Sequence, residues 1–146
     1  MLGILGTLYT CAIKRTFLLL VATLVVATGL ASPAAAARDR TLYLYYTHTK
    51  ETAKITYKRN GRFDTKGLAQ LNHFLRDWRR DEPTKMDPRL FDLIWEVYNE
   101  VGASKPIHVV SAYRSPKTNE MLRSRSSAVA KNSNHTRGLA MDFFIP

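Results

Sequence analysis

The sequence predicts an α+β domain, in which helices pack against a small, largely antiparallel sheet. Two neighbouring runs, 41–47 and 53–59, are rich in tyrosine, threonine and β-branched residues, which favours strands. Later segments combine helix-capping residues with apolar residues at steps of three and four, which favours helices. The expected order of elements is β-β-α-α-β-α-β.

The first two runs are expected to form a hairpin around residues 48–52. In the second run, Ile55 and Tyr57 alternate with lysine and threonine, as in a strand with one buried face. The first run is apolar on both faces. Asn60-Gly61 follows and predicts a turn at the end of the hairpin.

Two helices are expected next. Asp64 can cap a helix over 65–80, in which three leucines and Trp78 form one apolar stripe. Asp87-Pro88 is a capping residue followed by a proline at the first helical position. The predicted buried face of this second helix consists of Leu90, Ile94, Val97 and Val101.

The last third of the chain predicts a strand, a helix, a loop and a strand. The strand covers 107–112, and Ser115-Pro116 opens a helix to about Ser127, with Met121 and Leu122 facing inward. Small, polar and basic residues predict a loop over 124–134. The final strand is expected over 138–145.

Composition excludes several classes of protein. The chain has 146 residues, 45% of them hydrophobic and 10% aromatic, which is enough for one packed core and argues against disorder. Its single cysteine, Cys11, excludes an intrachain disulfide framework and a cysteine-based zinc cluster. The formal net charge of +10 indicates an anionic partner.

Residues 1–37 have the pattern of a signal peptide. Lys14 and Arg15 precede an uncharged apolar stretch, and small alanines follow it, so cleavage is expected after Ala36 or Ala37. The mature chain would keep 20 basic and 12 acidic residues, a net charge of +8. Export to the periplasm of a Gram-negative envelope is the expectation. An exported protein is not expected to bind nucleic acid. The membrane is expected as a partner only if the apolar segment within residues 1–37 is not cleaved.

His135 and Asp142 are the candidate metal ligands. Asp142 lies in the apolar final strand, on the expected face of Ala140 and Phe144, where a carboxylate needs a compensating cation. An imidazole and a carboxylate converging on one point are two ingredients of a zinc site. The spacing alone leaves open that Asp142 pairs with Arg114 or Arg137 and that His135 is a surface residue.

Arg114 is the candidate catalytic residue. It follows the strand over 107–112 and precedes a helix, where a guanidinium can bind a carboxylate or stabilise a developing oxyanion. A solvated arginine or a structural ion pair is the alternative that the residues alone leave open.

Two motifs together resemble a known family. The S-x-H-x-x-G-x-A-x-D segment from Ser133 to Asp142, downstream of S-x-Y-R-S from Ser111 to Ser115, resembles the zinc peptidases of the D-alanyl-D-alanine carboxypeptidase and dipeptidase group. The similarity is greater to the murein endopeptidase K-like branch of exported wall enzymes. Three further blocks of that branch are matched by Tyr46–Thr49, Leu71–Asp77 and Met86–Leu90.

The resemblance implies a fold, a cofactor and a reaction. The fold would be that of the D,D-peptidases and the Hedgehog signalling domain, and the reaction would be zinc-dependent hydrolysis of amide bonds in peptidoglycan cross-links. His135 and Asp142 would be the first two Zn²⁺ ligands, and Arg114 and Ser133 would bind substrate. Residues 38–146 would be the N-terminal part of this peptidase domain.

The third zinc ligand of the family is a histidine farther on, for which this chain offers no match. His48 and His73 lie in other family blocks and are expected to be structural, and His108 is a poor candidate. We therefore expect the C-terminal strands of the fold to be missing and the activity of this chain to be uncertain. The alternatives are a non-catalytic peptidoglycan-binding module and, if the apolar segment is uncut, a membrane-anchored basic protein.

Overall fold

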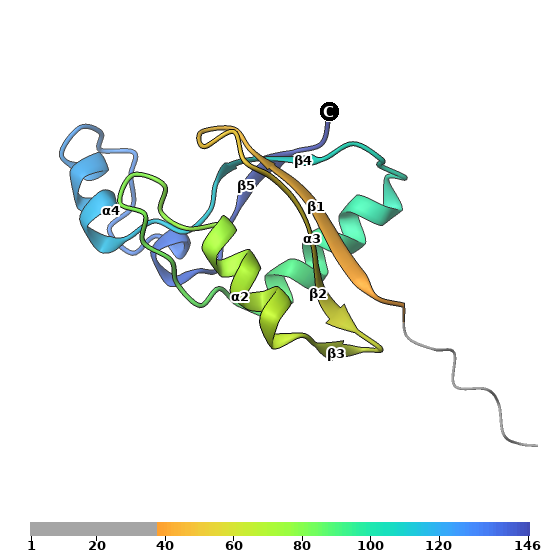
Figure 1. The fold of residues 1–146 in the computed structure, drawn as a ribbon. Coiled ribbons are helices and arrows are strands. Elements are labelled where there is room, and N and C mark those ends of the chain that lie inside the picture. Colours follow the sequence, from red (N-terminus) through yellow and green to blue (C-terminus); the bar gives the residue numbers. More distant parts are fainter. Residues whose placement is uncertain (1–37) are drawn as a thin grey trace, which may run out of the picture. The chain divides into compact units, whose positions relative to one another are not determined.

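The structure is a computed structural model, and it describes residues 38–146. Five strands form one sheet in the order β3-β2-β1-β4-β5 (Figure 1). They are β1 (Arg40–Tyr46), β2 (Thr52–Arg59), β3 (Arg62–Phe63), β4 (Ile107–Ser111) and β5 (Asp142–Phe144). The helices are α2 (Thr65–Phe74), α3 (Pro88–Glu100) and α4 (Pro116–Arg123), with the 3-10 turn η1 (Asn134–Arg137) before β5.

The predicted α+β class is confirmed. Only β1 and β4 pair in parallel, whereas β1–β2, β2–β3 and β4–β5 are antiparallel, so the sheet among residues 38–146 is mainly antiparallel. The predicted signal peptide, residues 1–37, lies outside the described residues. The boundary at residue 38 therefore stays a prediction.

One face of the sheet carries the core. Leu42, Leu44 and Tyr46 alternate along β1, and the inward residues of β2 and β4 extend the same apolar surface. Both α2 and α3 pack on it: Phe74 lies 6.2 Å from Tyr46 and Phe91 lies 5.9 Å from Tyr57, measured between ring centroids. The predicted alternation in the hairpin is confirmed.

The buried face of α3 differs from the prediction. Its start at the Asp87-Pro88 pair is as expected, and Ile94 is buried. Val97 and Val101, however, are 37% and 61% exposed, and Phe91 is buried in their place. The fully buried residues of α3 lie in its N-terminal half, whereas Trp95 and Tyr98 farther along pack against the core only partly buried.

Two helices are shorter than predicted. We expected α2 to run to Arg80, but it ends at Phe74 because the Leu75 carbonyl accepts a hydrogen bond from the Tyr113 N–H, 3.1 Å away. The expected helix to Ser127 ends at Arg123. Its buried residues are Thr118 and Asn119 and not the predicted apolar pair, which is only half-buried.

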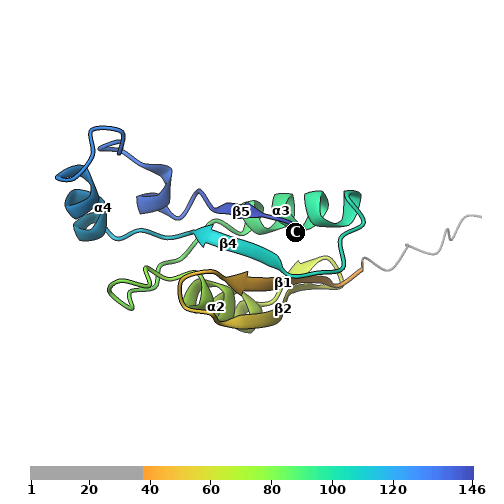
Figure 2. The ribbon, with the colours of Figure 1, turned by 90° about the horizontal axis from the view of Figure 1, so that it is seen from above.

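The C-terminal region is more irregular than predicted. In Figure 2, α4 lies beyond the C-terminal end of β4, and the chain then returns to place β5 beside β4. The 3-10 turn η1 begins at Asn134, the last residue of the predicted loop, and the expected strand over 138–145 is reduced to three residues. Within residues 38–146, no helix combines the length and the apolar character that crossing a bilayer requires.

Candidate metal centre

The junction between β4 and α4, residues 112–115, organises the candidate site. Ser115 is the N-cap of α4, and its hydroxyl accepts a hydrogen bond from the Thr118 N–H. The buried carboxylate of Asp77 accepts hydrogen bonds from the Ser115 N–H at 3.0 Å and from the Ser115 hydroxyl at 2.7 Å. The junction is thereby tied to the segment that follows α2.

His135 lies against the other side of the junction. Its Nδ1 is 2.8 Å from the carbonyl oxygen of Ala112, and its own carbonyl accepts a hydrogen bond from the Arg114 N–H at 3.2 Å. Because a carbonyl oxygen can only accept, Nδ1 carries a proton, and in the neutral ring the lone pair is on Nε2. The side chain is 14% exposed. The ring is therefore fixed with its free nitrogen directed away from the junction.

Asp142 opens β5 and faces His135. Its partner in the sheet is Ser111, and its Oδ2 lies 3.4 Å from Nε2 of His135. The side chain is 59% exposed, so the sequence argument that an apolar strand buries this carboxylate is wrong. Phe144, on the same face of the strand, is also exposed.

The separation of these two atoms fits a shared metal ion. Ligand atoms at about 2.0–2.2 Å from a tetrahedral zinc ion are about 3.4 Å apart. The carbonyl that holds Nδ1 of His135 is the type of second partner that ligating histidines ordinarily have. An ion pair with a protonated imidazole would place the two groups at a similar distance. The donor set therefore fits a metal ion and leaves an ion pair as the alternative.

The described residues supply two ligands of such a site. Among residues 38–146, no three histidine, cysteine, aspartate or glutamate side chains gather closely enough to hold a metal ion. His48 stacks on Trp78 at 4.5 Å, and His108 lies between the rings of Tyr45 and Phe144, at 4.9 Å from each. The imidazoles of these two histidines are engaged in aromatic contacts.

Arg114 is positioned by α4 and not by Asp142. One nitrogen of its guanidinium donates a hydrogen bond to the side-chain oxygen of Asn119 at 3.3 Å. The Asn119 amide donates in turn to the carbonyls of Ala130 and Lys131 and so ties the following loop to the helix. The ion-pair partner of Asp142 among residues 38–146 is His135, not Arg114 or Arg137.

Ser133 and Gly138 bracket the turn that presents His135. The Ser133 hydroxyl accepts a hydrogen bond from the backbone N–H of His135 at 3.3 Å and caps η1. Gly138 ends the turn with φ of +66°, and a Cβ there would lie 3.0 Å from Cα of Met86. Ser133 therefore has a structural task in addition to the substrate role expected of it.

Asp77 and Asn119 are the residues that sequence reasoning missed. Asp77 is 1% exposed. The available signal was its place at the end of the block Leu71–Asp77, which matches the resembled family. Asn119 is 4% exposed, although its polar neighbours suggest a solvated helix face. Nothing in the local spacing indicates its contact with Arg114.

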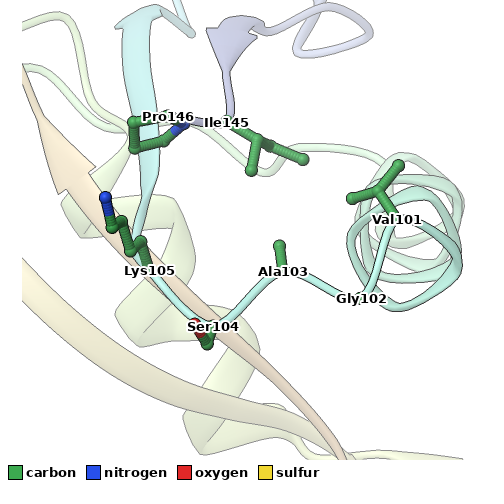
Figure 3. A pocket seen from close by; sticks show the side chains of 7 residues that line it. All are labelled: Val101, Gly102, Ala103, Ser104, Lys105, Ile145 and Pro146. Carbon is green, nitrogen blue, oxygen red and sulfur yellow. The ribbon is translucent and has the colours of Figure 1, made fainter.

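A hollow at the other end of β4 has different chemistry. Its volume is about 440 Å³, and its walls are the segment 101–105 and the residues Ile145 and Pro146 (Figure 3). Lys105 is the only ionisable side chain in this lining. The hollow lacks metal-ligating side chains, so the candidate site is the pair formed by His135 and Asp142.

Known proteins share this sequence pattern. Residues 34–146 match the family Peptidase_M15_2, described as "Peptidoglycan L,D-endopeptidase MepK". The chain is 44% identical over 108 residues to "Peptidoglycan L,D-endopeptidase MepK" of Escherichia coli (strain K12) and, at the same identity and length, to that of Shigella flexneri. These alignments cover 74% of this chain and 59% of either relative.

A more distant relative gives the same result. "Probable peptidoglycan L,D-endopeptidase MepK" of Haemophilus influenzae is 42% identical over 79 residues, which are 53% of this chain and 42% of that protein. The chain thus spans less than two thirds of the length of the curated relatives it matches. No solved structure matches the chain. The resemblance to the murein endopeptidase K-like branch is confirmed, and the chain belongs to the family Peptidase_M15_2.

Proposed function

We propose that this chain contributes the substrate-facing part of a zinc-dependent endopeptidase that hydrolyses amide bonds in peptidoglycan peptide cross-links. The names of the curated relatives support the substrate class. M15 peptidases are generally metal-dependent, which supports a metal cofactor. The observation that carries the proposal is the 3.4 Å approach of Nε2 of His135 to Oδ2 of Asp142, with Nδ1 engaged by a backbone carbonyl.

The side chains around this pair suit hydrolysis of an amide. Zinc, when bound, supplies a Lewis acid and lowers the pKa of a coordinated water to about 7. His135 offers a lone pair on a ring of fixed orientation, and Asp142 offers an anionic oxygen that is open to solvent. Arg114, whose guanidinium is hydrogen-bonded to Asn119, would donate hydrogen bonds to the oxygen on which negative charge develops.

Two protein ligands predict a weak metal site. Catalytic zinc is usually held by three protein ligands and keeps one position open. The described residues bring together an imidazole and a carboxylate, so residues 38–146 alone should bind zinc weakly. A general base is not assigned, since among residues 38–146 no further aspartate or glutamate gathers with His135 and Asp142.

Metal binding by this chain is the first test. Co²⁺, a spectroscopic substitute for zinc, should give a visible absorption band with the wild-type chain, and His135→Gln and Asp142→Asn should each weaken binding at least tenfold. Glu96→Gln is the matched control, because the Glu96 side chain is 58% exposed and lies on α3, away from the site. Unchanged binding in both site variants would remove the metal from the proposal.

Hydrolysis is the second test. Purified sacculi treated with the zinc-loaded chain should lose peptide cross-links, and chelation or Asp142→Asn should abolish this loss. If the muropeptide profile is the same with and without an intact Asp142, the peptidase assignment fails for this chain.

Export completes the proposal. Residues 1–37 would direct the chain to the periplasm, where its mature charge of +8 favours contact with the anionic wall. N-terminal sequencing of the exported form should give a start near Arg38. A start at Met1 would instead favour a membrane-anchored form.

A non-catalytic wall-binding module is the second candidate. It is favoured by the finding that the described residues bring together two metal-capable groups and not three. This alternative predicts that the chain is retained on insoluble peptidoglycan without releasing any product. Retention should then persist in Asp142→Asn and fall at high salt.

A further inference from the structure

Asp77 is a buried carboxylate just beyond the end of α2. It is 1% exposed, and within residues 38–146 it forms hydrogen bonds but no ion pair. Its Oδ2 accepts two hydrogen bonds from Ser115, and its Oδ1 accepts one from the Arg79 N–H at 3.1 Å. Burial raises the pKa of Asp77, but hydrogen bonds from Thr118, Ser115 and the backbone outweigh it and lower the pKa. The group is therefore an anion at neutral pH.

The position of Asp77 connects it to the candidate site. Ser115 lies at the end of the junction 112–115, and the Tyr113 N–H donates to the Leu75 carbonyl beside Asp77. The opposite side of the same junction holds His135 through the Ala112 carbonyl and the Arg114 N–H. Four consecutive residues thus lie between the carboxylate and the imidazole, with hydrogen bonds to both.

Capping of α4 alone does not account for Asp77. The Ser115 hydroxyl already accepts a hydrogen bond from the Thr118 N–H, which is the ordinary capping contact. Replacing both partners of a buried hydrogen bond by apolar groups of the same shape can be nearly neutral for stability, so stability by itself does not require an anion here. The Asp77 carboxylate accepts hydrogen bonds from both the N–H and the hydroxyl of Ser115. These two hydrogen bonds fix the orientation of the peptide group that precedes Ser115.

We propose that Asp77 is a positioning residue for His135 and Arg114. By fixing the 112–115 junction, it holds the Ala112 carbonyl where it orients the His135 ring, and it fixes the backbone from which Arg114 projects. The inference rests on the proposed function only in treating His135 as a metal ligand.

Asp77→Asn is the decisive variant. An amide has one oxygen and one NH₂ group, so it cannot accept from Ser115 and from the Arg79 N–H as the carboxylate does. Asp92→Asn is the matched control. Asp92, on α3, is a partly buried carboxylate that pairs with Lys58 of β2 and Arg40 of β1, away from the junction. Both variants lose buried polar contacts, and only one of them touches the junction.

The first readout is the tautomer of His135 in the metal-free chain, measured from ring nitrogen shifts at about pH 8.5, well above the usual histidine pKa of about 6.5. The wild-type chain and Asp92→Asn should show a proton on Nδ1. Asp77→Asn should show a mixture of tautomers, because the Ala112 carbonyl no longer fixes the ring. The wild-type tautomer in Asp77→Asn would overturn the inference.

The second readout is Co²⁺ affinity. Asp77→Asn should weaken binding by about tenfold, at the lower end of the effect of outer partners of ligating histidines, and Asp92→Asn should leave it within about twofold. Equal losses in both variants would reduce Asp77 to a stability role. A wild-type chain that binds no Co²⁺ would contradict the proposed function, while the tautomer readout would still decide the role of Asp77.

Ser115→Ala covers the case in which Asp77→Asn does not fold. It removes the 2.7 Å hydroxyl contact with Asp77 and keeps the backbone one. It should shift the His135 tautomer in the same direction by a smaller amount, and no shift would count against the inference.

Discussion

The contact between α2 and β2 gives the sharpest test of the packing. A Cβ on Gly67 would lie 2.0 Å from the Thr56 carbonyl oxygen and 2.9 Å from Cα of Tyr57. These are backbone atoms of a central part of the sheet, so they cannot rotate away as a flexible side chain does. Gly67→Ala must therefore move α2 off the sheet by about 1.4 Å to restore an ordinary contact of about 3.4 Å.

The cost can be worked from the side chains that would separate. Leu71 and Phe74 are buried on the same helix. Each contributes about 2–3 kcal/mol by burial, and a gap of about 0.5–1 Å between these side chains and the sheet already forfeits about a quarter to a half of their dispersion energy. Overpacking strain adds about 1–3 kcal/mol, and the better helix propensity of alanine returns about 1 kcal/mol. We expect a net loss of about 1–5 kcal/mol in the free energy of unfolding.

Urea unfolding of Gly67→Ala measures this loss, and Gly102→Ala is its control. Gly102 has φ of +62° but no atom within 4 Å of a built Cβ, so only backbone strain of about 1 kcal/mol is expected there. Helix propensity alone predicts the opposite sign at Gly67, namely a gain. A Gly67→Ala chain as stable as the wild type would show that the close approach of α2 and β2 is not real.

Three further predictions concern local contacts. Hydrogen bonds from Arg89 lower the pKa of Asp87 to about 2. The stabilisation of the fold by the ionised Asp87 is therefore complete above about pH 4 and is lost as the pH falls toward 2. In Asp87→Asn, the free energy of unfolding measured in urea should change less over this pH interval than in the wild type. Gly138→Ala forces a side chain into the left-handed region against a close backbone and should lower the unfolding free energy by about 1–3 kcal/mol in urea titrations. Asn119→Leu removes the hydrogen bonds to Arg114 and to the carbonyls of Ala130 and Lys131. Trypsin should then cut the 124–133 loop several-fold faster, because the loop is no longer tied to α4. An unchanged cleavage rate would contradict the assigned contacts.

Local sequence signals were sufficient to predict the helices that begin with a capping residue and the strand in which apolar and polar residues alternate. Asp64, Asp87 and Ser115 each cap the helix that the sequence assigns to them. The ends of the helices are less predictable because distant groups decide them. The apolar stripe of α2 continues to Trp78, but the Leu75 carbonyl bonds to a residue 38 positions away and the helix stops.

The sequence identified His135 and Asp142 as candidate ligands from their residue types. It did not predict their distance in space or their exposure to solvent. Seven positions separate His135 from Asp142, a spacing compatible with many distances in space. The expectation of a buried carboxylate treated the final run as a strand inside a sheet. In the structure, β5 is three residues long at the edge of the sheet, and the side chain of Asp142 is open to solvent.

The geometry of the pair follows from the way β4 ends. The register of β4 and β5 shifts between Val109 and Ser111, which brings Asp142 opposite Ser111. Ala112 is the next residue, and its carbonyl orients the ring of His135. One short stretch of backbone therefore sets the position of the carboxylate through strand pairing and that of the imidazole through a hydrogen bond. Because both ligands depend on the same stretch, a group that fixes it, as we propose for Asp77, affects metal affinity without contacting either ligand.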